Sequence, residues 1–393
     1  RSRRQRQMCI RDRLEVSSQV GRHYGIFFTS MLYLTIGPSF AIPRCATVAF
    51  SVGLEQMIPK ENYTMALAVF SLLFFAAVLF FSLRPGEILV WIGKVLNPLF
   101  LCFLAILVVR ALISPMGEVQ MMEAEGAYAS GAFFTGVLEG YNTMDALASL
   151  AFGIIVVNVI RGLGVEEPEH TAKNTVKAGI FSSLLMAAIY LLVTLVGAQS
   201  RAVIGVSENG GVALAGIAEH YFGAAGALIL AATVTLACLK TAVGLITSCG
   251  ETFEEMVPKG PSYKVWAVGF CVISFVIANL GLNSIIAYSV PVLMFLYPLA
   301  ITLILLTIFG KCFGNDAVMY RWVTGFTAVA SVVDFVNALP EAAQKFLHLG
   351  TFVETAKSIL PFADLGFGWV CPALLGLVIG TVHVMIRKKE VRG

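Results

Sequence analysis

A group of glycine, hydroxyl, amide and carboxylate residues interrupts a long apolar stretch of this sequence. Residues 131–160 are long enough to cross a bilayer, for which about 20 residues suffice, yet their centre at 139–145 reads EGYNTMD. A carboxylate at mid-depth costs about 2.5–3.5 kcal/mol on membrane-insertion scales, so it is retained where it meets a partner, water or a ligand. The pattern predicts a helix that is interrupted near the membrane midplane, which is typical of solute-binding sites in transporters.

The interruption offers groups that suit both charges of a zwitterion. Gly140 permits unwinding, which releases backbone carbonyls that can bind a cation, while a released helix N-terminus attracts a carboxylate. The same glycine also fits an alternative, a helix-packing seam with Gly136 and Gly140 in close contact and Asp145 paired to another helix. For the binding hypothesis, the predicted substrate contacts are Gly140, Tyr141, Asn142, Thr143 and Asp145, with Phe152 helping to line an apolar pocket.

Small and hydroxyl-bearing residues recur at helical spacing within the apolar stretch 224–249. Ala237, Thr241, Gly244 and Ser248 would share one face of a helix. Thr and Ser oxygens suit a sodium ion, so we predict that Thr241 binds a monovalent cation together with Cys238 and Ser248. No other metal site is predicted. A stripe of small residues also packs helices together, and this alternative remains open.

The first apolar stretch, 24–43, contains residues that disfavour a straight helix. Gly37, Pro38 and Pro43 predict a kink near its outer end, because proline removes a helical hydrogen bond. Arg44 follows directly and is predicted to act as a gate at the outer mouth. The alternative is an arginine that snorkels from a helix end.

A second carboxylate, Asp334, lies in the apolar stretch 322–338. Its place near the outer end of that stretch predicts that interfacial water solvates it. Asp145 and Asp334 together allow a hypothesis of another class, an intramembrane aspartyl protease, in which two carboxylates share a proton. Depth argues against it, since Asp145 is central and Asp334 peripheral, and neither residue follows Gly-x-Gly.

The composition is that of a membrane protein. Hydrophobic residues are 58% of the 393 residues and charged residues only 13%, against about one-quarter charged in soluble domains. The net charge of +3 is too small to indicate nucleic-acid binding. The eight cysteines and five histidines are scattered without metal-ligand spacing, so no disulfide framework, zinc site or cofactor is predicted.

About ten apolar stretches predict an all-α polytopic membrane protein. With residues 387–389 placed in the cytoplasm, Lys and Arg concentrate in the loops on that side, which sets the orientation. The basic run 1–13 is expected to be a non-native or disordered extension, and 14–393 a single transmembrane domain. The predicted spans lie near 24–43, 66–82, 88–113, 131–160, 178–198, 224–249, 265–280, 284–309, 322–338 and 362–386.

Several segments, in order along the chain, resemble the bacterial branched-chain amino acid:cation symporters of the liv-II carrier family. The similarity runs from about residue 14 to the C-terminus. It rests on YLTIGPSFAIPRCATVAFSVG at 33–53, GYNTMDALASLAFGIIVVN at 140–158, LACLKTAVGL at 236–245, NLGLNSIIAYSVPVL at 279–293 and GFGWVCPALL at 366–375.

The resemblance implies twelve helices in a leucine-transporter-like inverted repeat with discontinuous helices, of which this chain is expected to lack the first two. It further implies sodium-driven uptake of leucine, isoleucine and valine across the bacterial inner membrane, with alternating access, and no enzymatic activity. A proton-coupled transporter of the same fold is the alternative. A passive channel is disfavoured because no ring of charges or carbonyl filter motif is present. The expected partners are the amino acid, the cation and membrane lipid, without nucleic acid.

Overall fold

The computed structural model describes residues 19–55, 58–84, 87–119, 122–164, 167–257, 259–310, 314 and 316–390. Within these ranges the regular structure is helical and contains no β-strand. The basic run 1–13 lies outside them. The chain divides into two compact units: the first comprises Arg1–Ile36, Ala124–Ile154 and Ile286–Gly393, and the second comprises Gly37–Glu123 and Ile155–Ile285.

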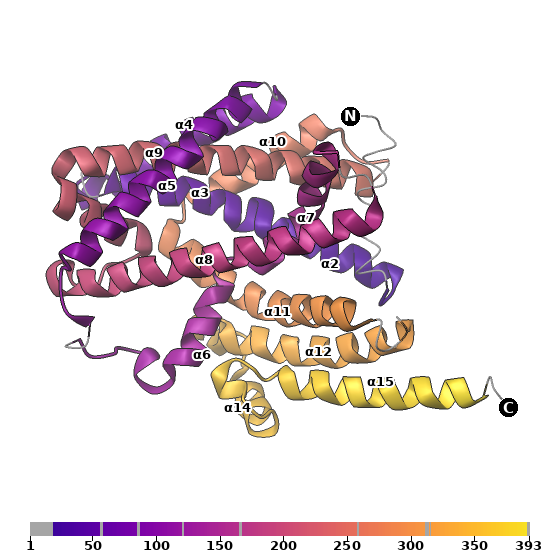
Figure 1. The fold of residues 1–393 in the computed structure, drawn as a ribbon. Helices are drawn as coiled ribbons and strands as arrows, with labels where there is room; N and C mark the ends of the chain where they lie inside the picture. Colours follow the sequence, from indigo (N-terminus) through magenta and orange to yellow (C-terminus); the bar gives the residue numbers. More distant parts are fainter. Residues whose placement is uncertain are drawn as a thin grey trace. The chain divides into compact units, whose positions relative to one another are not determined.

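The second unit is built around one long helix, α9 (Gly210–Met256), which bends at Gly223. Its core consists of aliphatic side chains from α3, α5, α8 and α9, including Val52, Leu107, Val196 and Leu230. Burial of such side chains stabilises the packing of these helices. The helices that pack on α9 are α3 (Ala41–Gly53), α4 (Tyr63–Leu83, after the 3-10 turn η3, Lys60–Asn62), α5 (Glu87–Ile113), α8 (Pro168–Ile204) and α10 (Tyr263–Ala278) (Figure 1).

Helix α8 is largely exposed along its length. Only 6% of its apolar segment is buried within the protein. Phe181, Leu184 and Leu191 are among the large apolar side chains that it exposes. A helix that is apolar and yet uncovered is suited to contact with lipid.

The first unit contains α2 (Arg22–Leu34), α6 (Tyr128–Tyr141) and most of α11 (Leu282–Phe309). In this unit α12 (Ala317–Ala338) and α15 (Val370–Glu390) pack against each other and lie side by side (Figure 1). The chain between them forms two short helices and a 3-10 turn. These are α13 (Glu341–Phe346), α14 (Gly350–Ile359) and η6 (Ala363–Leu365); α14 packs on α12 and on η6, and η6 packs on α6.

The predicted start of the last span is wrong. We expected helix from residue 362, whereas α15 begins at Val370. Phe362 and Gly366 both have left-handed backbone angles, at φ 65° and 73°. Regular α-helix is interrupted at such residues, and 362–369 forms a turn ahead of α15.

The predicted kink in the first span is confirmed. Between α2 and α3 the chain forms a wide turn, η1 (Thr35–Ser39), in which Gly37 has non-helical angles and is followed by Pro38. A Cβ atom at Gly37 would lie 2.6 Å from Cys249 Sγ of α9. Glycine is therefore required here for close approach as well as for the turn.

Six helical segments of the described residues are long and apolar enough to cross a membrane. Two of the other predicted spans correspond to helices that are short or interrupted: α10 has only 16 residues, and 128–162 is divided into two helices. The chain is thus a multi-pass helical membrane protein. The six segments are Arg22–Gly53, Lys60–Leu83, Glu169–Ile204, Gly210–Met256, Leu282–Phe309 and Val370–Arg387.

Candidate functional site

The predicted interruption of the 131–160 stretch is confirmed. Helix α6 ends at Tyr141 and α7 (Asp145–Gly162) begins at Asp145. Between them Met144 takes a left-handed conformation at φ 60°, which a helix cannot accommodate. Two helix ends of opposite polarity therefore meet within a few residues.

Polar side chains of the break bind its backbone locally. Thr143 Oγ1 donates to Gly140 O (2.8 Å) and accepts a bond from Asp145 N–H (3.5 Å). Asn142 Nδ2 donates to Glu139 Oε2 (3.0 Å). Asn and Thr side chains compete in this way with helical hydrogen bonding. This explains why the helix is interrupted at 142–144 rather than elsewhere in residues 131–160.

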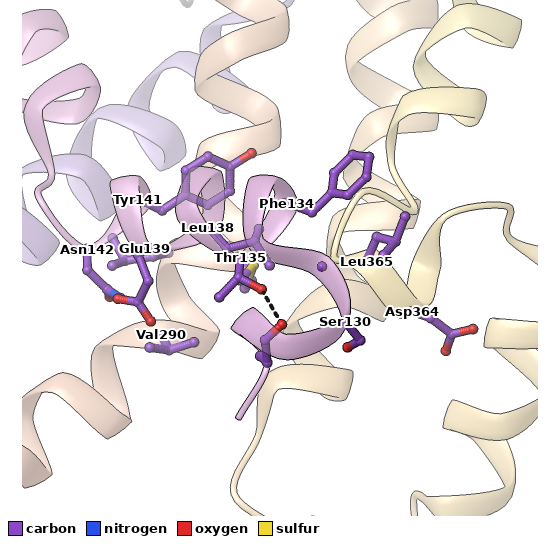
Figure 2. Close-up of a pocket in the computed structure, with 14 residues that line it drawn as sticks. Ser130, Phe134, Thr135, Leu138, Glu139, Tyr141, Asn142, Val290, Asp364 and Leu365 are labelled. Atoms are coloured by element: carbon purple, nitrogen blue, oxygen red, sulfur yellow. Dashed lines mark hydrogen bonds between the residues drawn. The ribbon is translucent and has the colours of Figure 1, made fainter. Parts of the chain in front are cut away.

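A cavity of about 350 Å³ lies beside the end of α6 in the first unit (Figure 2). Its walls come from α6, from α11 and from η6. In Figure 2, Glu139 and Asn142 lie together at one side and Asp364 at the other. The apolar lining is Phe134, Leu138, Val290, Leu293, Met294 and Leu365, and the polar lining includes Ser130, Thr135, Glu139, Asn142 and Asp364.

The cavity has the chemistry of a site for a small apolar molecule that carries a positive group. Its polar lining contains two carboxylates, Glu139 and Asp364, of which Asp364 lies 3.7 Å from Lys357, and no Lys or Arg is among the described residues that line it. Aliphatic side chains supply the rest of the surface. Its volume is at the lower end of small-molecule sites, which span about 300–1,000 Å³.

Part of the predicted substrate set lines this cavity. Tyr141 and Asn142 do so, while Gly140, Thr143 and Asp145 lie in the same turn without lining it. Phe152 also does not line it: its ring packs edge-on against Tyr33 of α2, with centroids 6.4 Å apart.

The packing-seam alternative finds no support at its glycines. A Cβ atom at Gly136 or Gly140 would meet no described atom within 4 Å.

Several lining residues were not predicted. Glu139 could have been found, since it is a carboxylate within the break that the sequence displays. Leu293 and Met294 of α11 and Asp364 of η6 carry no local signal, because only the tertiary fold brings them to α6.

Asp334 does not lie where the sequence placed it. We expected interfacial solvation, but Asp334 is only 4% exposed. The chain between α12 and α15 covers it: the Trp369 backbone N–H donates to its carboxylate. This burial was not predicted, because the sequence predicts a loop at 339–361 and the start of the last span at 362–369.

The predicted cation ligands lie on α9, in the second unit. Thr241 is exposed, and its Oγ1 donates to Ala237 O (3.0 Å), which leaves its lone pairs available. Ser248 is half-buried on the same helix. Cys238 instead lies within hydrogen-bonding distance of Cys45 on α3. Arg44, the predicted gate, lies in the first turn of α3 and is half-buried.

Comparison with known proteins decides the family. A family model described as branched-chain amino acid transport protein matches residues 8–387. The chain belongs to this family.

Named relatives agree with the family. The chain is 48% identical to the branched-chain amino acid permease BrnQ of Lactobacillus delbrueckii subsp. lactis, over 96% of this chain and 84% of the relative. It is 37% identical to BrnQ of Bacillus subtilis, over 95% and 83%. It is 35% identical to the branched-chain amino acid transport system 2 carrier protein of Pseudomonas aeruginosa, over 93% and 81%.

As a member of the branched-chain amino acid transport protein family, the chain is a transporter of the bacterial membrane and not an enzyme. The aspartyl protease hypothesis for Asp145 and Asp334 is therefore wrong.

Proposed function

We propose that this protein imports leucine, isoleucine and valine across the bacterial inner membrane by symport with sodium, with its C-terminus in the cytoplasm. The observation that carries the proposal is the cavity at the broken helix, with aliphatic walls and two carboxylates. The names of the relatives support the same substrate class.

The break suits a zwitterion. The C-terminal end of α6 carries partial negative charge and the N-terminal end of α7 partial positive charge. We place the substrate ammonium near Glu139 and the end of α6, and its carboxylate near the first amides of α7. Tyr141 and Asn142 line the space between, and Thr143 and Asp145 hold the turn in shape.

An aliphatic side chain would occupy the apolar part of the cavity, against Leu138, Leu293 and Met294. Burial of apolar surface stabilises it by about 25 cal/mol per Å². Leucine and isoleucine are isomers and valine has one CH2 group fewer, a difference of about 0.8 kcal/mol, so all three should be accepted.

For the cation we propose Thr241 and Ser248 on α9, with sodium preferred and a proton as the alternative. One charge that enters down about 100 mV yields about 2.3 kcal/mol, which supports roughly forty-fold accumulation. Alternating access in a twelve-helix inverted-repeat fold would expose the site to each side in turn.

Uptake of radiolabelled leucine into proteoliposomes tests the proposal, with an inward sodium gradient and with potassium in its place. Glu139→Gln, which removes the charge that we place beside the substrate ammonium, should strongly reduce sodium-dependent accumulation. The matched control is Glu118→Gln, an exposed carboxylate outside the cavity, which should transport normally. Equal uptake in sodium and potassium would refute sodium coupling, and no leucine uptake under either gradient would refute the substrate.

A further inference from the structure

Asp334 is a buried carboxylate that does not line the proposed substrate cavity. It is 4% exposed. The Trp369 N–H donates to it, while its Oδ2 has no hydrogen-bond partner among the described residues. A buried carboxylate that is half-satisfied is costly, so a specific role must explain it.

The surroundings of Asp334 supply no cationic partner. Among the described residues it forms no ion pair. Buried aromatic residues are its neighbours: Trp369 itself, and Tyr141, on whose hydroxyl the Asp334 carboxylate acts electrostatically. The ionisable side chains on the neighbouring elements include Glu139 and Tyr141 on α6, Tyr297 on α11, Glu354 and Lys357 on α14, Asp364 in η6, and Cys371, His383 and Arg387 on α15. Lys357 lies 3.7 Å from Asp364.

The segment that Asp334 holds is also a wall of the cavity. Trp369 ends the turn 362–369, and Asp364 and Leu365 within that turn line the cavity. The same turn packs on α6: Phe367 contacts Phe134, with ring centroids 5.5 Å apart, and a Cβ atom at Gly366 would lie 2.8 Å from Leu138 Cδ1. The turn is thus fixed between Asp334 on one side and α6 on the other.

The strength of this attachment depends on charge. An N–H bond to an ionised carboxylate is roughly twice as strong as a bond to a neutral acceptor. If Oδ2 takes a proton from hydronium, the carboxyl group becomes neutral and its bond to Trp369 N–H weakens. No electron moves in this step, and one O–H bond forms on Oδ2 as one breaks on hydronium.

We propose that Asp334 is a positioning residue for the substrate cavity: its ionised carboxylate holds the turn 362–369 against α6, and proton uptake releases that turn and weakens substrate binding. The part concerning substrate rests on the proposed function. By linkage, binding that favours the ionised form strengthens as pH rises through the titration of Asp334 and weakens as pH falls.

The first test requires no substrate. The chain has four tryptophans, so 5-fluorotryptophan labelling gives few fluorine resonances, and Trp369→Phe identifies the one from Trp369. We expect this resonance to shift with pH in the wild-type protein and in Glu354→Gln, an exposed carboxylate on α14. In Asp334→Asn the shift should be lost. A Trp369 resonance that is indifferent to pH in the wild type overturns the proposal, as does an unchanged titration in Asp334→Asn.

The second test measures the Kd of leucine against pH. In the wild type the affinity should fall on acidification, by up to about tenfold per pH unit for one proton. Asp334→Asn, which mimics the protonated form, should bind weakly at every pH. If the Trp369 resonance titrates as expected and leucine does not bind at all, the positioning role stands and the proposed substrate fails.

Gly368→Ala keeps the proposal testable if Asp334→Asn does not fold. A Cβ atom there would lie 3.1 Å from Asp334 Oδ1 and 3.4 Å from Ala363 Cβ, so it should displace the carboxylate and move the midpoint of the Trp369 titration. A midpoint identical to that of the wild type would count against the proposal.

Discussion

The rings of Tyr141 and Tyr297 stack with their centroids 4.2 Å apart and their planes at 6°. This pair joins the last residue of α6 to α11, and both helices line the cavity. Both rings are buried. The stack therefore fixes the end of α6 from which the proposed substrate site begins.

Tyr297→Ala should lower both stability and leucine affinity. An aromatic pair contributes about 0.5–1.5 kcal/mol beyond its buried area, and the lost ring also leaves a void. Thermal unfolding of the purified protein and the Kd of leucine measure the two effects. Tyr297→Phe should retain most of both, since it keeps the stacked ring. Tyr288→Ala, at an exposed position of α11, is the control and should change neither.

Glu139→Gln should weaken binding of leucine more than binding of an analogue that lacks the ammonium group. Glutamine can still accept the bond from Asn142 Nδ2 at this position, so the local turn is preserved while the negative charge is lost. Competition against radiolabelled leucine by leucine and by 4-methylpentanoate makes the comparison. If the variant weakens both ligands equally, the ammonium does not lie at Glu139.

Gly37→Ala should destabilise the protein through one identifiable clash. The added Cβ would lie 2.6 Å from Cys249 Sγ, and overpacking of this kind costs about 1–3 kcal/mol. Cys249→Ala removes the sulfur, so the double variant should recover part of the loss. A double-mutant cycle on thermal unfolding measures the coupling. Strictly additive effects would mean that Gly37 is required for the turn alone.

Thr241→Ala should raise the sodium concentration for half-maximal uptake by about tenfold, equivalent to about 1.4 kcal/mol. Thr241→Ser keeps the hydroxyl and should remain close to the wild type. Cys238→Ala should leave the sodium dependence unchanged, because Cys238 lies against Cys45 instead. If uptake by Thr241→Ala depends on sodium as it does in the wild type, the cation binds somewhere other than Thr241.

The breaks in helices were predictable from sequence because their causes are local. Gly140, Asn142 and Thr143 lie where α6 gives way to α7, and Gly37 and Pro38 lie where α2 gives way to α3. Each disfavours helix through its own backbone or side chain. A single sequence displays such residues directly.

Burial and long-range contacts were not predictable in this way. Asp334 looked solvated because its helix ends nearby, and nothing in the sequence of 339–369 indicated that this segment returns over it. The contribution of Leu293 and Asp364 to the cavity likewise depends on how α11 and η6 pack on α6. Hydrophobic periodicity assigns a residue to one face of a helix, but it does not identify the helix that packs against that face.

The length of α8 has a consequence for the surrounding lipid. At about 1.5 Å per residue, its 37 residues extend over about 55 Å, nearly twice the hydrocarbon thickness of about 30 Å. With so little of it covered by protein, α8 can match the bilayer only by tilting or by extending into the headgroups. A change in bilayer thickness, set by acyl-chain length, should therefore change the tilt of α8. We expect transport rates to differ between thin and thick membranes of otherwise equal composition.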